Sequence, residues 1–140
     1  MTDYAGDLTP QEAWDLLVSD PATILVDVRT EAEWRFTGVP DTSETGREPV
    51  FIEWVNYPEG ARNLAFVDQL IKAGVTPDTG APIVFLCRSG ARSIGAATAA
   101  TAARIGPSYN ILDGFEGAPD AAGHRGIRGW KANGLPWRQG

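Results

Sequence analysis

The sequence predicts an α/β fold, a three-layer domain whose mostly parallel central sheet carries helices on both faces. Short apolar runs alternate with helix signals along the chain, an order typical of parallel sheets. The run over 82–86 leads directly into the only cysteine, Cys87. With 140 residues, 43% of them hydrophobic, the chain has the size of one unit with its own core. We therefore expect a single domain over 1–140.

The first predicted helix occupies 9–20. Thr9 and Glu12 have the spacing of a capping box, and Pro10 stands at the first helical position, where its missing N–H costs nothing. A buried strand over 23–28 follows the helix.

A second capping box, formed by Thr30 and Glu33, begins a short helix that Gly38 ends. The segment 41–49 is polar with glycine and proline, and we interpret it as a loop that covers the site or contacts a second copy. A second strand is predicted over 50–55.

The rest of the chain repeats the alternation of helix and strand. The expected elements are a helix over 63–74, the strand over 82–86, a helix over 91–104, a strand over 109–112, a glycine-rich connection over 118–126 and a short helix around Trp130. The helix over 63–74 should bury Leu64, Val67, Leu70 and Ile71. The helix over 91–104 is rich in alanine and lacks proline, so propensity alone supports it.

Cys87 stands where a strand gives way to a glycine-containing loop and a long helix. Backbone N–H groups of such a loop and the positive end of the helix dipole favour a thiolate over a thiol. Arg88 and Arg92 lie within the same short segment. A lone cysteine is more often a small buried hydrophobe, but a packing residue has no need of this loop, so we expect Cys87 to be a nucleophile.

Composition excludes several classes of function. The formal net charge of −6 argues against binding to nucleic acid. One cysteine and one histidine exclude an intramolecular disulfide and a metal site of cysteines and histidines, so we expect no metal and no cofactor. The acidic N-terminus and the lack of a long apolar run predict a cytoplasmic protein that does not bind membranes.

Three motifs in this order resemble the rhodanese, or thiosulfate sulfurtransferase, family in its single-domain form. They are Asp27-Val28-Arg29 with Glu31-Ala32-Glu33-Trp34, then Cys87-Arg88-Ser89-Gly90-Ala91-Arg92-Ser93, and finally Leu112-Asp113-Gly114-Phe115 with Gly129-Trp130 through Gly134-Leu135-Pro136-Trp137. The resemblance covers nearly the whole chain. It implies a rhodanese-like fold and a reaction that passes through a Cys87 persulfide.

In the implied reaction the Cys87 thiolate takes the outer sulfur of thiosulfate and passes it to cyanide or a thiol. The persulfide would be held by the rest of the loop, that is by Arg88, Ser89, Gly90, Ala91, Arg92 and Ser93. Converging N–H groups stabilise such a negative sulfur as an oxyanion hole stabilises oxygen. The arginines suit a dianion, although either can instead pair with a carboxylate, and Ser93 can equally help cap the helix.

Asp27 and Arg29 should end on the same side of the sheet as Cys87, because parallel strands share a carboxyl edge. We expect mainly a structural role, in which Asp27 accepts backbone N–H groups and Arg29 bridges to Glu31, Glu33 or Glu116, while both tune the charge of the site. His124 can pair with a thiol in other enzymes, but its glycine-rich surroundings favour a surface position.

Several alternatives remain open from the sequence. A cysteine phosphatase or arsenate reductase has five residues between the cysteine and its arginine, whereas four separate Cys87 from Arg92, and this loop holds no aspartate. A persulfide relay module that delivers sulfur to a partner protein would need the same loop. A silent regulatory domain would not need the cysteine.

Overall fold

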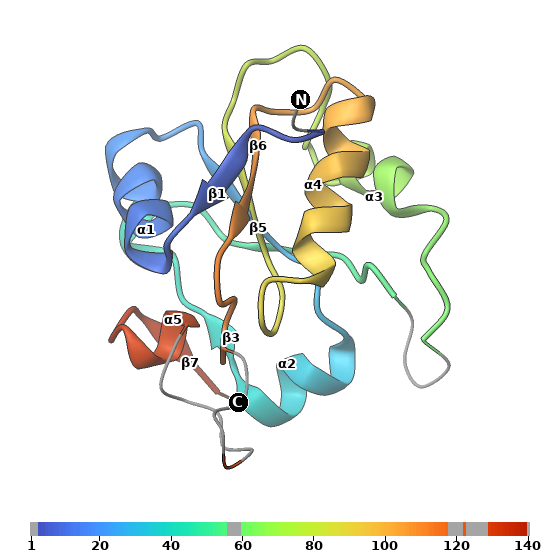
Figure 1. The fold of residues 1–140 in the computed structure, drawn as a ribbon. Coiled ribbons are helices and arrows are strands. Elements are labelled where there is room, and N and C mark those ends of the chain that lie inside the picture. The colour runs from blue at the N-terminus through green and yellow to red at the C-terminus, as the bar shows by residue number, and fades with distance from the viewer. Residues whose placement is uncertain (1–2, 56–59, 118–121, 123–128, 140) are drawn as a thin grey trace.

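Five parallel strands form the central sheet of the computed structural model (Figure 1). The structure describes residues 3–55, 60–117, 122 and 129–139. In spatial order the strands are β1 (Gly6–Leu8), β6 (Ser108–Ile111), β5 (Ile83–Leu86), β2 (Ile24–Asp27) and β4 (Val50–Phe51). Each neighbouring pair runs parallel, so the predicted α/β class with its mostly parallel sheet is confirmed.

Helices cover both faces of this sheet (Figure 1). They are α1 (Pro10–Ser19), α2 (Glu31–Thr37), α3 (Phe66–Lys72), α4 (Arg92–Ala102) and α5 (Gly129–Ala132), with a short 3₁₀ helix, η1, over Ser43–Thr45. Successive side chains of β5 alternate between two cores, because a strand points them to opposite faces. Ile83 and Phe85 join the core under α3 and α4, and Val84 and Leu86 join the core under α1 and α5.

Both predicted capping boxes are present. The Glu12 N–H donates to Thr9 Oγ1 at 3.1 Å, and the Thr9 N–H donates back to the Glu12 carboxylate at 2.9 Å. Thr30 and Glu33 make the same reciprocal pair at the start of α2. These caps fix where α1 and α2 begin, and the second one also holds the Glu33 carboxylate close to the carboxyl edge of the sheet.

No sequence pattern predicted β1 (Gly6–Leu8) or a small second sheet. That sheet pairs β3 (Val39–Pro40) with β7 (Trp137–Arg138) in antiparallel fashion. These strands are two or three residues long, too short to show the alternation that predicts a strand. They form because sequence-distant backbone lies beside them, which a local pattern does not reveal.

Two predicted elements differ in extent. The strand predicted over 50–55 ends at Phe51. Helix α3 begins at Phe66, and the predicted buried position Leu64 is 89% exposed. Asn63 still acts at this helix start, because its side-chain oxygen accepts the Ala65 N–H at 3.1 Å. The later start moves the buried face of α3 to Phe66 and Leu70.

Two expectations fall on parts of the chain that lie outside the described residues: the glycine-rich connection over 118–126, apart from Ala122, and the position of His124. The segment 41–49 holds η1 beside α1, and the Asp41 N–H donates to the Pro136 carbonyl at 2.9 Å. Within the described ranges, no helix is both long enough and apolar enough to cross a bilayer.

A buried ion pair lies at the carboxyl end of β2. Asp27 and Arg29 are both 0% exposed, and the Arg29 guanidinium donates to the Asp27 carboxylate at 2.7 and 3.0 Å. The same guanidinium donates to Thr37 Oγ1 at 2.8 Å and to the Gly38 carbonyl at 2.9 Å. It also lies 4.2 Å from the ring centre of Phe115. Arg29 thus ties β2 to the end of α2 and to the segment after β6.

The expectation that Arg29 bridges to Glu31, Glu33 or Glu116 is therefore wrong. Its carboxylate partner is Asp27, two residues earlier in the chain. The reason is geometric, since alternate residues at a strand end point to the same side. A scaffold role for the pair agrees with these contacts.

Arg29→Met should lower the free energy of unfolding by about 3–5 kcal/mol, because it leaves the buried Asp27 carboxylate without its cation. Urea denaturation measures this loss. Arg35→Met is the matched control, since its ion pair with Glu31 is 73% and 67% exposed and should be worth less than about 1 kcal/mol. Equal losses in the two variants would contradict the structural role of the buried pair.

Candidate functional site

Cys87 follows the last residue of β5, and its sulfur lies between that strand and the first turn of α4. The residue is 1% exposed. The Gly90 N–H donates to Cys87 Sγ at 3.1 Å, and the Ser93 hydroxyl oxygen lies 3.2 Å from the same sulfur. The loop therefore curls around the sulfur, with one backbone donor aimed directly at it.

Gly90 is required at the tightest point of this loop. Its φ of +98° lies in the left-handed region, which residues with a Cβ rarely adopt. A Cβ there would also lie 3.1 Å from the Asp113 nitrogen and 3.4 Å from the Ile111 carbonyl oxygen. The conformation directs the Gly90 N–H at Cys87.

The turn after β6 holds the loop from the opposite side. The Phe115 N–H donates to the Cys87 carbonyl at 2.8 Å, and the N–H groups of Glu116 and Gly117 donate to the Arg88 carbonyl at 3.0 and 3.1 Å. These bonds pair the carbonyl groups of Cys87 and Arg88 with the turn, while the Gly90 N–H donates to the sulfur. Gly114 permits the close approach, because a Cβ on it would lie 2.3 Å from the Cys87 carbonyl oxygen.

Gly114→Ala should displace the Cys87 loop and lower the free energy of unfolding by about 2 kcal/mol or more, since the clash is with backbone and the residue has positive φ. Urea denaturation and the rate of Cys87 alkylation measure the two effects. Gly74→Ala is the matched control, because Gly74 has a φ of +94° with open space around its missing Cβ. If both variants alter the rate of Cys87 alkylation equally, the close approach of Gly114 does not determine the position of the Cys87 loop.

Arg92 is held by Glu33 of α2. Its two terminal nitrogens donate to the two carboxylate oxygens at 2.7 and 2.8 Å, a bidentate pair. The hydrogen bond to Glu33 raises the pKa of Arg92; burial opposes this, and the charges of Glu33, Cys87 and Asp27 reinforce it. Arg92 thus presents a fixed positive charge to the sulfur while its guanidinium is occupied by a carboxylate.

Burial raises the pKa of Glu33, but the hydrogen bond and charge of Arg92, the Thr30 N–H and the charge of Arg29 together outweigh it. The pKa of Glu33 therefore lies below its ordinary value of 4.5. A carboxyl group with a lowered pKa in the folded state stabilises the fold above its unfolded pKa. This stabilisation is lost as the pH falls through the folded pKa.

Glu33→Gln should lower the free energy of unfolding by about 1–2 kcal/mol at neutral pH, because the amide keeps the helix cap but loses the charge-assisted bonds to Arg92. The difference from the wild type should shrink below about pH 4. Urea denaturation across this pH range measures it. A difference that stays constant with pH would show that the charge of Glu33 is not the cause.

Arg88 lies at the outer side of the loop. Its side chain is 43% exposed, and its Nε donates to Glu116 at 3.2 Å. Ser89 is half-buried and Ala91 is exposed. The structure thus brings Gly90 and Ser93 to the sulfur and places Arg88 and Arg92 beside the loop, each paired with a carboxylate.

Ser93 does not cap α4. Its hydroxyl is 0% exposed and donates to the side-chain oxygen of Asn110, and the cap position, Ala91, makes no side-chain cap bond. Asn110 was not predicted as a site residue, although an amide inside a predicted strand is a usable signal of a buried polar contact. No local pattern reveals Glu33 and Glu116 as the partners of Arg92 and Arg88.

Asp27 is paired in register with Leu86, the residue before Cys87, but its carboxylate is engaged by Arg29. A cavity of about 410 Å³ lies near this edge of the sheet, lined by Trp34, Val39, Phe51 and Arg138. The Trp34 and Phe51 rings meet edge to face at 5.3 Å.

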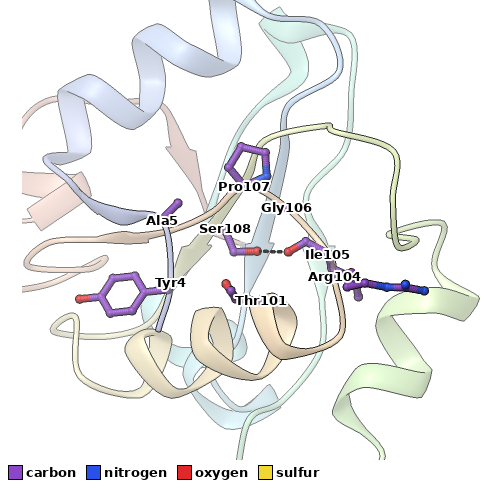
Figure 2. Close-up of a pocket in the computed structure, with 8 residues that line it drawn as sticks. All are labelled: Tyr4, Ala5, Thr101, Arg104, Ile105, Gly106, Pro107 and Ser108. Carbon is purple, nitrogen blue, oxygen red and sulfur yellow. Dashed lines mark hydrogen bonds between the residues drawn. The ribbon is translucent and has the colours of Figure 1, made fainter. Parts of the chain in front are cut away.

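A second cavity, of about 340 Å³, lies at the opposite edge of the sheet, where β1 and β6 begin (Figure 2). Tyr4, Pro107 and Ser108 line it. Cys87 follows the other end of the neighbouring strand β5, so this cavity is separate from the loop. Among the residues that the structure describes, no cluster of three or more histidine, cysteine or acidic side chains could hold a metal ion.

This chain is similar in sequence and in fold to several known proteins. The family model for the Rhodanese-like domain matches residues 9–118. An uncharacterized protein of Rickettsia conorii is 38% identical over 127 residues, covering 91% of this chain and 92% of that protein. The crystal structure of Rv0390 from M. tuberculosis is 57% identical, has a TM-score of 0.89 and covers 98% of this chain and 99% of that one.

A more distant structure shares the fold alone. It is the solution structure of the polysulfide-sulfur transferase homodimer from Wolinella succinogenes, 22% identical with a TM-score of 0.63. The match covers 99% of this chain and 80% of that chain.

Proposed function

This chain belongs to the rhodanese-like domain family, and we propose that it is a sulfurtransferase in which Cys87 carries sulfane sulfur as a persulfide. Family membership supports sulfur transfer or phosphatase-like chemistry at this loop. The observation that carries the proposal is the Gly90 N–H, which points at Cys87 Sγ from 3.1 Å. A donor in that position stabilises a negative sulfur.

The proposed reaction has two displacements at sulfur. The Cys87 thiolate attacks the outer sulfur of thiosulfate, a new S–S bond forms, and the S–S bond of thiosulfate breaks with its electron pair leaving on sulfite. A thiolate or cyanide acceptor then attacks the terminal sulfur of the persulfide. Cys87 leaves as a thiolate, and the acceptor departs as a persulfide or as thiocyanate.

The loop residues have distinct proposed roles. The backbone from Arg88 to Arg92 forms the cradle, and removal of one donor of this kind costs about 3 kcal/mol of transition-state stabilisation in other enzymes. Arg88, with 43% of its side chain exposed, is the group available to meet an anionic donor. Arg92 contributes its charge while paired with Glu33, and Ser89 and Ala91 line the outer part of the loop.

Loop length favours sulfur over phosphate. Four residues separate Cys87 from Arg92, one fewer than in the phosphatase pattern. Arg92 is also engaged at both terminal nitrogens by Glu33, so it is not free to grip a tetrahedral oxyanion. We propose thiosulfate as the donor and a thiol, on a small molecule or a partner protein, as the acceptor. The chain's sole, free cysteine supports a reducing compartment such as the cytoplasm.

The mass of the intact protein after incubation with thiosulfate tests the proposal. The wild type should gain one sulfur atom and lose it again with cyanide, whereas Cys87→Ser should gain none. Polysulfide serves as a second donor, because the Wolinella succinogenes protein with this fold is a polysulfide-sulfur transferase. Circular dichroism should show the same secondary structure in the wild type and in Cys87→Ser, so that a difference in sulfur gain reports on the thiol.

Each outcome has a distinct meaning. Sulfur gain on Cys87→Ser, or no gain on the wild type with either donor, would overturn the assignment. A stable persulfide that resists cyanide but passes to a protein thiol would identify a relay. Hydrolysis of an aryl phosphate ester without sulfur loading would identify a phosphatase.

A further inference from the structure

A chain of hydrogen bonds leads from the sulfur of Cys87 to the edge strand β1. The Ser93 hydroxyl lies 3.2 Å from Cys87 Sγ and donates to Asn110 Oδ1. Asn110 Nδ2 in turn donates to an oxygen of Asp7 at 3.0 Å, and the Tyr4 hydroxyl donates to the same oxygen at 2.9 Å. Ser93 and Asn110 are 0% and 1% exposed, whereas Asp7 is exposed.

Asp7 determines which groups donate and which accept along this series of hydrogen bonds. An ionised carboxylate only accepts hydrogen bonds, so the NH₂ group of Asn110 faces Asp7 and its oxygen faces Ser93. The hydrogen bond to Asp7 raises the pKa of Tyr4 above its ordinary value of 10.0, with burial and the Asp7 charge adding to the effect. Tyr4 therefore remains a second donor to Asp7.

Ser93 has one hydroxyl hydrogen, and that hydrogen is directed at the Asn110 oxygen. A lone pair of Ser93 consequently faces Cys87 Sγ. The sulfur lies between one donor, the Gly90 N–H, and one acceptor, the Ser93 oxygen. This arrangement suits a thiol that donates its S–H to Ser93, whereas a thiolate would face a lone pair.

We propose that Asp7, Asn110 and Ser93 form a positioning network that favours the thiol form of Cys87 over the thiolate. When the thiol proton passes to solvent, the thiolate gains a second donor only if the Ser93 hydroxyl turns from Asn110 to the sulfur. The nucleophile then has two donors, Gly90 and Ser93, in place of one. A role for this network in sulfur transfer rests on the proposed function of Cys87. The test of the network measures only the pH at which the Cys87 thiol ionises.

Other charged groups around the sulfur come from every element near it and remain unchanged in the test variants. They are Arg88 in the loop, Arg92 on α4, Asp27 at the end of β2 with its partner Arg29, Glu33 on α2, and Asp113 and Glu116 after β6. The face of α3 in the core that contains Cys87 is apolar, formed by Phe66 and Leu70. A difference between variants therefore reports on the hydrogen-bond network.

Asn110→Leu is the direct test. It removes the acceptor of the Ser93 hydrogen, so the hydroxyl can donate to the sulfur without losing a bond. The ultraviolet absorbance of the thiolate, corrected with Cys87→Ser, should show a midpoint about half to one pH unit lower than in the wild type, the size of one hydrogen bond. In a Ser93→Ala background, Asn110→Leu should produce no such shift.

Asp7→Ala is the second variant, because Asp7 is exposed and its replacement does not disturb the core. Without the carboxylate the Asn110 amide can turn its NH₂ group to Ser93, which again frees the hydroxyl for the sulfur. The thiolate midpoint should fall in this variant. Asp3→Ala removes the same charge from the same exposed segment and should leave the midpoint unchanged, as should Tyr4→Phe, which keeps the bond between Asp7 and Asn110.

The proposal is overturned if Asn110→Leu or Asp7→Ala raises the pH midpoint of thiolate formation or leaves it unchanged. It is also overturned if Asn110→Leu lowers this midpoint equally in the Ser93→Ala background. These results do not depend on sulfur loading, which the mass experiment measures separately. A protein that fails to take up sulfur can still show the network, and one that takes up sulfur can still lack it.

Discussion

The guanidinium of Arg29 is the attachment point on which the position of the Cys87 loop depends. Its donors hold the end of β2 through Asp27 and the end of α2 through Thr37 and Gly38, and its flat face rests on Phe115. The Phe115 N–H in turn donates to the Cys87 carbonyl. A buried cation thus connects the end of a strand, the end of a helix and the turn that holds the Cys87 loop.

Positive charge at the site is balanced within its own surroundings. Arg92 is paired with Glu33 and Arg88 with Glu116, so each cation at the site has its own carboxylate. In the proposed reaction a negative sulfur would be stabilised mainly by the Gly90 N–H, with a contribution from the charge of Arg92. Preorganised groups of this kind need no rearrangement when charge develops. In the proposed reaction, an acidic protein would in this way hold an anionic persulfide.

Sequence patterns predicted the parts of the fold that depend on local chemistry. The capping boxes at Thr9 and Thr30, the strand leading to Cys87 and the alanine-rich helix after it are each determined by residues within a few positions of one another. The strands β1, β3 and β7 were missed because their pairing comes from distant backbone. In the site, the cysteine and its glycine were visible in sequence, but the partners of the arginines and the amide of Asn110 arrive from other elements. Contacts between elements are set by packing, which a linear pattern does not record.

Cys87 is both the only cysteine of the chain and almost completely buried. A sulfur atom or an oxidant that reacts with it meets no second thiol within the same molecule, so no internal disulfide can form to resolve the adduct. In the proposed sulfur transfer, each cycle would therefore end with a thiophile from outside the molecule. The enclosing loop limits which molecules can serve, since a resolving group has to reach a sulfur that the backbone surrounds. In the proposed reaction, turnover and repair of Cys87 would thus both depend on molecules from outside the protein.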